Sequence, residues 1–229
     1  MLRDDYIMRM IEQLGQALAQ ALKLGNLGQF QQALMSLDQA CHQFFGLDMK
    51  LLNDLDQDYL LAMMTTDGIL DTDKALIAAE LLNAEGDLYA EAHQPNEAAR
   101  RHLKALYLLA SAFETDSGAT LPGRPPLLQP LQDKLTAYEL PAATLQKLFD
   151  HYEYTGRYDK AEDMLYERLH LYGFDRRAVR VGIGFYHRLL AHSDAELAAG
   201  GLPRDEVEYG LAELTDQLPP LLRSPYPRT

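Results

Sequence analysis

Several residue types are missing or scarce in this 229-residue chain, which has no tryptophan and a single cysteine, Cys41. A lone cysteine cannot form an internal disulfide, and its position in an apolar helical stripe predicts a small buried hydrophobe, not a reactive thiol. No apolar run approaches the roughly 20 residues that a membrane-spanning helix needs. The first residues also lack the apolar core of a secretion signal. These absences favour a chain that works in a reducing cytoplasm and binds no membrane.

Basic residues are also in short supply, because 21 Lys and Arg stand against 34 Asp and Glu for a formal charge of −13. A chain of this sign repels phosphate backbones. The charge therefore argues against nucleic acid as the main partner.

Patterns that carry catalysis are missing as well. No two of the seven histidines lie three or four residues apart, so no helix offers a His pair to a metal ion. There is no Gly-x-Ser-x-Gly elbow and no Gly-rich phosphate loop. Gly182 and Gly184 form a Gly-x-Gly inside a helical stripe, where close helix packing explains them better than a nucleotide. We therefore predict a chain that is not an enzyme and holds no cofactor and no metal.

What the sequence does contain is helical periodicity. Apolar residues recur three and four positions apart over most of the chain, whereas strand-like alternation is nearly absent. Capping and breaking residues divide the pattern into long helices and shorter elements. The shorter elements are a turn capped by Asp48, helices capped by Asp56 and Ser193, and a poor helix that contains Leu127, Leu128, Leu131 and Leu135. The long helices are expected over about 4–24, 29–45, 72–91, 95–113, 141–155, 158–171, 175–190 and 203–214. The pattern predicts an all-α fold with one domain over 1–218 and an extended or disordered tail over 219–229.

Three pairs of these helices meet at a similar short turn followed by alanine. The alanines are Ala33, Ala98 and Ala161, which lie 65 and 63 residues apart. Such spacing predicts three stacked helical hairpins, with one intervening helix near 48–65 and another near 126–138. Small residues at the contact would let the two helices of a hairpin approach closely.

The detail inside each hairpin resembles the tetratricopeptide repeat. In the middle hairpin the matching residues are Gly86, Tyr89, Ala98 and Ala105. The first hairpin has Ala21, Leu24, Ala33 and Ala40, and the third has Phe149, Tyr152 and Ala161. Phe149 departs from the small residue of the family, and His102 stands where the family is usually apolar. The resemblance implies a right-handed superhelix of about three hairpins. The whole chain also resembles a bacterial group of tetratricopeptide-like proteins that has a similar opening helix, here 4–13, and no assigned activity.

In tetratricopeptide proteins the first helix of each hairpin lines a concave groove that binds peptides. The resemblance implies groove positions on two helices, and these are mostly acidic, unlike the Lys and Asn that clamp a carboxylate in chaperone-binding members. A basic or neutral peptide is therefore the expected ligand, and an ordinary hydrophilic face is the alternative. The positions are Glu80, Asn83, Asp87 and Glu91 on one helix and Gln146, Lys147, Asp150, Glu153 and Tyr154 on the other.

A second candidate surface is basic and lies on the helix expected over 175–190. Its residues are Arg176, Arg177, Arg180 and Arg188, preceded in the chain by Arg168. Internal pairing with the acidic remainder of the chain is one interpretation. A subunit contact or an anionic ligand is the other.

The sequence thus predicts a non-catalytic scaffold or adaptor of a bacterial cytoplasm that binds a protein or peptide. Self-association through an uncapped apolar end is a further expectation. The alternative is a regulatory sensor domain that binds a small ligand or a signalling peptide in the helical groove. A pocket lined by Tyr89, Tyr152 and Tyr154 would favour that alternative.

Overall fold

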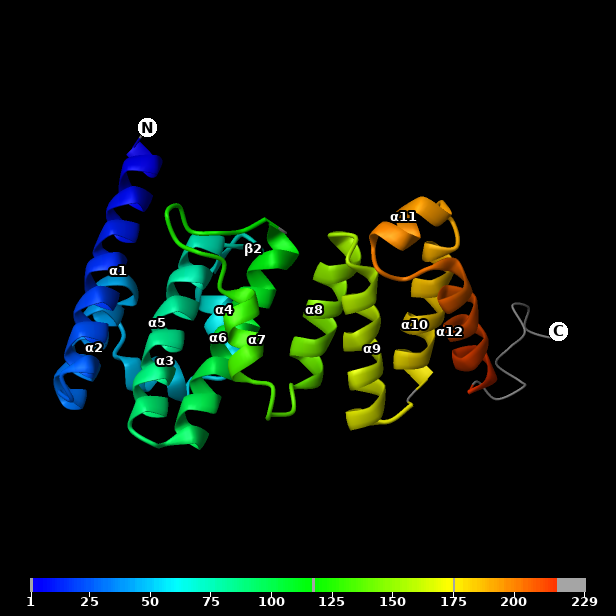
Figure 1. Ribbon diagram of the computed structural model, residues 1–229. Helices are drawn as coiled ribbons and strands as arrows, with labels where there is room; N and C mark the ends of the chain where they lie inside the picture. The colour runs from blue at the N-terminus through cyan, green and yellow to red at the C-terminus, as the bar shows by residue number, and fades with distance from the viewer. Residues whose placement is uncertain (1, 117, 175, 218–229) are drawn as a thin grey trace. The chain divides into compact units, whose positions relative to one another are not determined.

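The computed structural model describes residues 2–116, 118–174 and 176–217. Within these residues the chain forms twelve helices and one two-stranded hairpin, which confirms the all-α prediction (Figure 1). The elements are α1 (Leu2–Asn26), α2 (Phe30–Phe45), α3 (Met49–Asp54), α4 (Gln57–Met63), β1 (Thr65–Thr66), β2 (Ile69–Leu70), α5 (Thr72–Glu91), α6 (Pro95–Thr115), α7 (Leu128–Lys134), α8 (Ala142–Tyr154), α9 (Tyr158–Tyr172), α10 (Arg176–Leu189), α11 (Asp194–Ala199) and α12 (Arg204–Asp216). The tail predicted over 219–229 lies outside the described residues.

The chain divides into two compact units, which we call unit 1 (Met1–Leu140) and unit 2 (Pro141–Thr229). Each has its own apolar core, and each is described separately below. The single domain over 1–218 stays a prediction.

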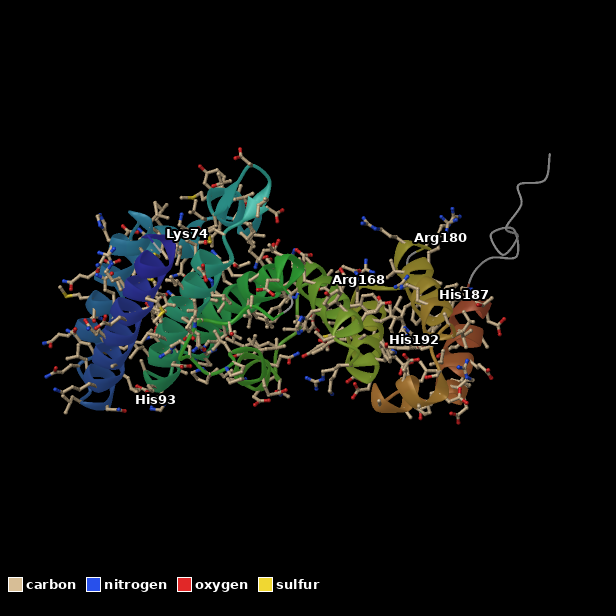
Figure 2. The ribbon with its side chains drawn as sticks, turned by 90° about the horizontal axis from the view of Figure 1, so that it is seen from above. Lys74, His93, Arg168, Arg180, His187 and His192 are labelled. Atoms are coloured by element: carbon tan, nitrogen blue, oxygen red, sulfur yellow. The ribbon has the colours of Figure 1, made fainter. Side chains whose placement is uncertain are left out.

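Three helical hairpins form where the sequence predicts them: α1–α2 and α5–α6 in unit 1 and α8–α9 in unit 2. Their turns share one backbone geometry. In each, a residue with left-handed φ lies two positions before the second helix: Gly28 at 72°, His93 at 58° and Gly156 at 72°. Figure 2 shows His93 at the turn end of its hairpin. Glycine favours this conformation because it has no Cβ to clash with the backbone.

The hydrogen bonds of the three turns also match. The amide that follows each left-handed residue donates to the carbonyl five residues earlier, from Gln29 to Leu24, Gln94 to Tyr89 and Arg157 to Tyr152, each at 2.9 Å. This bond satisfies a carbonyl at the end of the first helix that has no helical partner. The alanine of each predicted contact lies four residues after the donor of this bond. These alanines, Ala33, Ala98 and Ala161, are all buried. The recurrence read from the sequence is therefore a recurrence of structure.

Helix α5 is the centre of unit 1. It packs against α1 and α2 as well as against its hairpin partner α6. Apolar residues accordingly lie on several sides of α5, and Ala75, Leu76, Ile77, Leu81 and Leu82 are all buried. Such a distribution is expected where neighbouring helices cover more than one side of a helix.

The segment between α2 and α5 differs from the prediction of one intervening helix. It holds two short helices, α3 and α4, whose N-terminal amides are capped by the side chains of Asp48 and Asp56 as expected. After them, Asp67 and Gly68 both have positive φ and join β1 to β2, with Thr65 opposite Leu70. Two-residue strands are too short to show alternation, so only the Asp-Gly pair signals this hairpin.

Unit 2 adds α10, α11 and α12 to the α8–α9 hairpin, and α10 packs against both α9 and α12. Ser193 caps the N-terminus of α11 and forms a capping box with Glu196, and the cap at Ser193 was predicted from the sequence. The close-packing interpretation of Gly182 is confirmed, because a Cβ built there would lie 2.4 Å from Leu214 and 2.9 Å from Leu165.

The close approach of α5 and α6 gives a testable prediction. A Cβ at Gly86 would lie 2.4 Å from Nε2 of His102, a buried ring that is held by Asp87. We expect Gly86→Ala to lower the free energy of unfolding by about 1–3 kcal/mol, as overpacking does. The matched control is Gly15→Ala in α1, where a Cβ meets nothing within 4 Å. It should raise the free energy of unfolding by up to about 1 kcal/mol through helix propensity. Urea denaturation measures both, and equal effects at the two positions would contradict the packing.

Candidate functional site

Unit 1 contains a cleft between α1 and α5 that we call the α1–α5 cleft. Its volume is about 170 Å³. All four groove positions predicted in this unit line it, because residues 80, 83, 87 and 91 lie on one face of α5. The full lining is Leu18, Ala21, Leu22, Glu80, Asn83, Ala84, Asp87, Leu88, Glu91 and Arg124.

The predicted acidity of this face is largely neutralised inside unit 1. Arg124, from the loop after α6, donates to Glu80 at 2.9 Å. Lys134 at the end of α7 donates to Asn83 at 2.7 Å and to Asp87 at 2.9 Å. Asp87 also faces Nε2 of His102 at 3.1 Å. Burial acts to raise the pKa of Asp87, but the hydrogen bonds from His102 and Lys134 outweigh burial and hold it below its usual value.

Glu91 is the exception among the four. Its side chain is exposed at the C-terminal end of α5, and it makes no hydrogen bond or ion pair with the other described residues. It also lines a neighbouring hollow of about 230 Å³ beside the α1–α2 turn, together with Phe30 and Leu88. Glu91 is therefore the acid of this face that is available to a ligand.

The groove positions predicted on the third hairpin lie along α8 in unit 2. Gln146 donates to Asp150 at 3.0 Å, one helical turn away. Glu153 accepts two hydrogen bonds from Arg188, at 2.6 and 2.8 Å. Tyr154 is 78% exposed. Because these residues belong to unit 2, a groove continuous with α5 stays a prediction. The same holds for a tyrosine pocket, since Tyr89 lies in unit 1.

The predicted basic patch is smaller than the sequence suggests. Arg188 is bound by Glu153, and the first cause of its raised pKa is that hydrogen bond. Internal pairing, one of the two interpretations of the patch, is thus what the structure shows for Arg188. Arg176, Arg177 and Arg180 remain exposed on α10, and Figure 2 shows Arg180 reaching away from that helix.

A larger cleft of about 480 Å³ opens among α2, α3, α5 and α6, and no pattern in the sequence predicted it. We call it the α2–α6 cleft. Apolar, acidic and basic side chains share its walls. They are Gln31, Leu34, Met35, Asp38, Met49, Lys50, Asn53, Asp54, Glu85, Tyr89, Glu97, Arg100 and Arg101.

A buried ion pair forms one side of this cleft. The Arg101 Nε lies 3.1 Å from Oε2 of Glu85, and Nη1 donates to both the carboxylate and the main-chain carbonyl of Glu97. Asn53 donates to Glu85 at 2.7 Å, and the Tyr89 ring lies 4.0 Å beneath the guanidinium. Burial is the largest influence on Glu85 and leaves its pKa raised despite these partners. The pKa of the nearby Cys41 thiol is raised to about 12, chiefly by burial, so Cys41 is an unreactive core residue as predicted.

Lys104 on α6, three residues after Arg101, attaches α3 to α6. Its ammonium donates to the carbonyls of Leu52, Asn53 and Leu55 at 3.1, 2.5 and 2.7 Å. These are carbonyls at the C-terminal end of α3, where a positive charge is stabilising. Burial lowers the pKa of Lys104. The one signal of this network in the sequence is the pair of basic residues Arg101 and Lys104, which lie three positions apart on α6 and are both buried.

Unit 2 contains a second polar cluster, which is partly buried. The Tyr186 hydroxyl, fully buried, donates to Glu162 at 2.5 Å, and the Tyr166 hydroxyl donates to Glu213 at 2.6 Å. Burial raises the pKa of Glu162, and Glu206, Asp163 and Glu213 add to the shift, while the bond from Tyr186 opposes it. Burial likewise raises the pKa of both tyrosines.

Two features are absent from the described residues. No group of three or more His, Cys, Asp or Glu there could hold a metal ion. Across the same residues, no helix has both the length and the apolar character needed to cross a membrane.

The raised pKa of Glu162 gives a prediction about pH. The stability contributed by a carboxyl whose folded pKa lies above its ordinary value of 4.5 is complete below pH 4.5 and is lost as pH rises through the folded value. We expect Glu162→Gln to gain free energy of unfolding relative to the wild type as pH rises from 4.5 to 8. Denaturant unfolding across this range tests it. Glu208→Gln, at an exposed position of α12, shows the effect of removing one surface charge. A Glu162→Gln difference that is flat with pH would contradict the assignment.

Comparison with known proteins gives one match. The model of a family of unknown function (DUF6483) matches residues 1–219. No curated protein and no solved structure matches the chain. The match spans α1 to α12, and hence both clefts of unit 1 and the polar cluster of unit 2. This chain therefore belongs to the DUF6483 family.

Proposed function

We propose that this protein is a non-catalytic scaffold of the tetratricopeptide type, which binds a segment of another bacterial cytoplasmic protein in the α1–α5 cleft. The observation that carries the proposal is the equivalence of the three hairpin turns in φ, hydrogen bonding and alanine position. Arrays of equivalent hairpins bury each other's faces and leave the first helices to line a binding surface. In unit 1, α1 and α5 are those first helices, and they pack together.

The chemistry of the cleft defines the partner more closely. Its α1 wall is apolar, with Leu18 buried at its base and Leu22 59% exposed. Glu91 supplies an exposed carboxylate in the same lining. Glu80 and Asp87 are held by Arg124 and Lys134, so they shape the cleft and contribute little free charge. An aliphatic side chain beside a Lys or Arg is the peptide element that fits.

This partner is a narrower version of the basic or neutral peptide predicted from the sequence. The aliphatic group would cover Leu22, and burial of such a side chain contributes about 1.5–3 kcal/mol. The adjacent cation would pair with Glu91 at the rim. A rim pair of this kind adds selectivity and association rate more than affinity.

Two cleft variants test the proposal by quantitative affinity capture from the extract of the native cell. Glu91→Lys reverses the available charge, and Leu22→Asp places a charge on the apolar wall. Both side chains are exposed, so the fold should be retained. We expect proteins captured by the wild type to be depleted at least tenfold with each variant.

The matched control is Glu139→Lys, the same charge reversal at an exposed position outside the cleft. It should retain the wild-type set of partners. Peptide display with the purified protein provides the second measurement, and it should enrich aliphatic residues beside Lys or Arg. A wild-type set that survives both cleft variants, or display that enriches acidic peptides, would refute the proposed cleft.

A further inference from the structure

The α2–α6 cleft has the size and mixed lining of a small-molecule site. Its volume of about 480 Å³ falls within the roughly 300–1,000 Å³ typical of ligand pockets. Leu34, Met35 and Met49 give it an apolar wall, while Glu85 and Arg101 supply fixed charges. The cleft does not share a residue with the α1–α5 cleft.

Arg101 is the feature that points to a ligand. Only 9% of this residue is exposed, although it lines the cleft. Its guanidinium is fixed by Glu85, by Glu97 and by stacking on Tyr89. Its Nη2, however, makes no hydrogen bond with any described residue. A buried arginine that is held rigid and keeps a spare donor is prepared to bind an anion, because little flexibility is lost on binding.

The other charges of the cleft define the rest of the ligand. Four carboxylates against three cations in the lining leave one net negative charge, so a simple anion would be poorly matched. Asp38 uses Oδ1 to accept from the amide of Met49 at 2.8 Å, and its Oδ2 makes no hydrogen bond. Glu85 likewise uses only Oε2. Asp38 Oδ2 and Glu85 Oε1 are thus available to a cation, and Arg101 Nη2 is available to an anion.

We propose that the α2–α6 cleft binds a free α-amino acid with an aliphatic side chain. The carboxylate of the ligand accepts from Arg101 Nη2, and its ammonium group donates to Asp38 and Glu85. The aliphatic side chain covers Met35, which is 61% exposed. Lys50 and Arg100, both exposed, add positive charge to the lining of the cleft. This binding goes beyond the scaffold function and would make unit 1 a sensor of amino acids.

Isothermal titration calorimetry with three probes tests the charges separately. L-leucine carries both groups, 4-methylpentanoate lacks the ammonium, and 3-methylbutylamine lacks the carboxylate. We expect L-leucine to bind at least tenfold more tightly than either of the others. No detectable leucine binding, or an amine that binds as tightly as leucine, overturns the proposal.

Three variants of the full chain locate the site. Arg101→Lys keeps the charge that faces Glu85 but removes the fork of donors, and Asp38→Asn keeps the acceptor for Met49. Each should weaken leucine binding at least tenfold, whereas Arg180→Lys, the same arginine replacement on α10, should leave it unchanged.

Amide chemical shifts of the wild-type protein give a reading that does not depend on any variant folding. Addition of L-leucine should move amides within 31–54 and 85–101. Shifts confined to other segments, or wild-type affinity in a folded Arg101→Lys protein, would contradict the assignment.

Discussion

The left-handed residue in each hairpin turn is the constraint on which the rest of the structure depends. It lets the next amide bond back five residues to the end of the first helix, and it sends the second helix back along the first. The alanine of the second helix is buried in every hairpin. Where α5 and α6 meet, His102 occupies the space beside Gly86 that a side chain would otherwise fill. The path of the chain and the packing of its helices are thus set by the same few residues.

Two charged residues of α6, Arg101 and Lys104, are held in place by contacts with neighbouring helices. Arg101 and Lys104 both project from α6 into polar partners on α5 and α3, and they tie these elements together by ion pairs and by capping of carbonyls. Buried pairs of this kind stabilise a fold weakly, because desolvation offsets most of the attraction. They do fix geometry, which is what a binding cleft requires. The chain's net charge of −13 therefore says little about the α2–α6 cleft, whose lining holds four acids and three bases.

Local signals in the sequence predicted the local structure well. Asp48, Asp56 and Ser193 cap helices as expected, and the four α5 positions share a face because helical spacing requires it. Their neutralisation was not predictable, because Arg124 and Lys134 come from a loop and a short helix whose path no local pattern specifies. The α2–α6 cleft was not predictable for the same reason. It depends on contacts between distant parts of the chain, such as those that Lys104 makes with carbonyls 49 to 52 residues away. Pairings over such distances depend on the packed fold.

The equivalence of the three turns is tested most directly by replacing the left-handed residue of each turn and measuring the free energy of unfolding. Gly28 and Gly156 have open space where a Cβ would stand, so alanine there reports on the backbone alone. Gly28→Ala and Gly156→Ala should each destabilise the protein by about 1–2 kcal/mol, the energy of a left-handed conformation for a residue with a Cβ. His93→Gly should have the opposite sign, because it relieves that same strain in the middle turn. A change of the same sign at all three positions, or no change at any, would contradict the repeated turn and the architecture built on it.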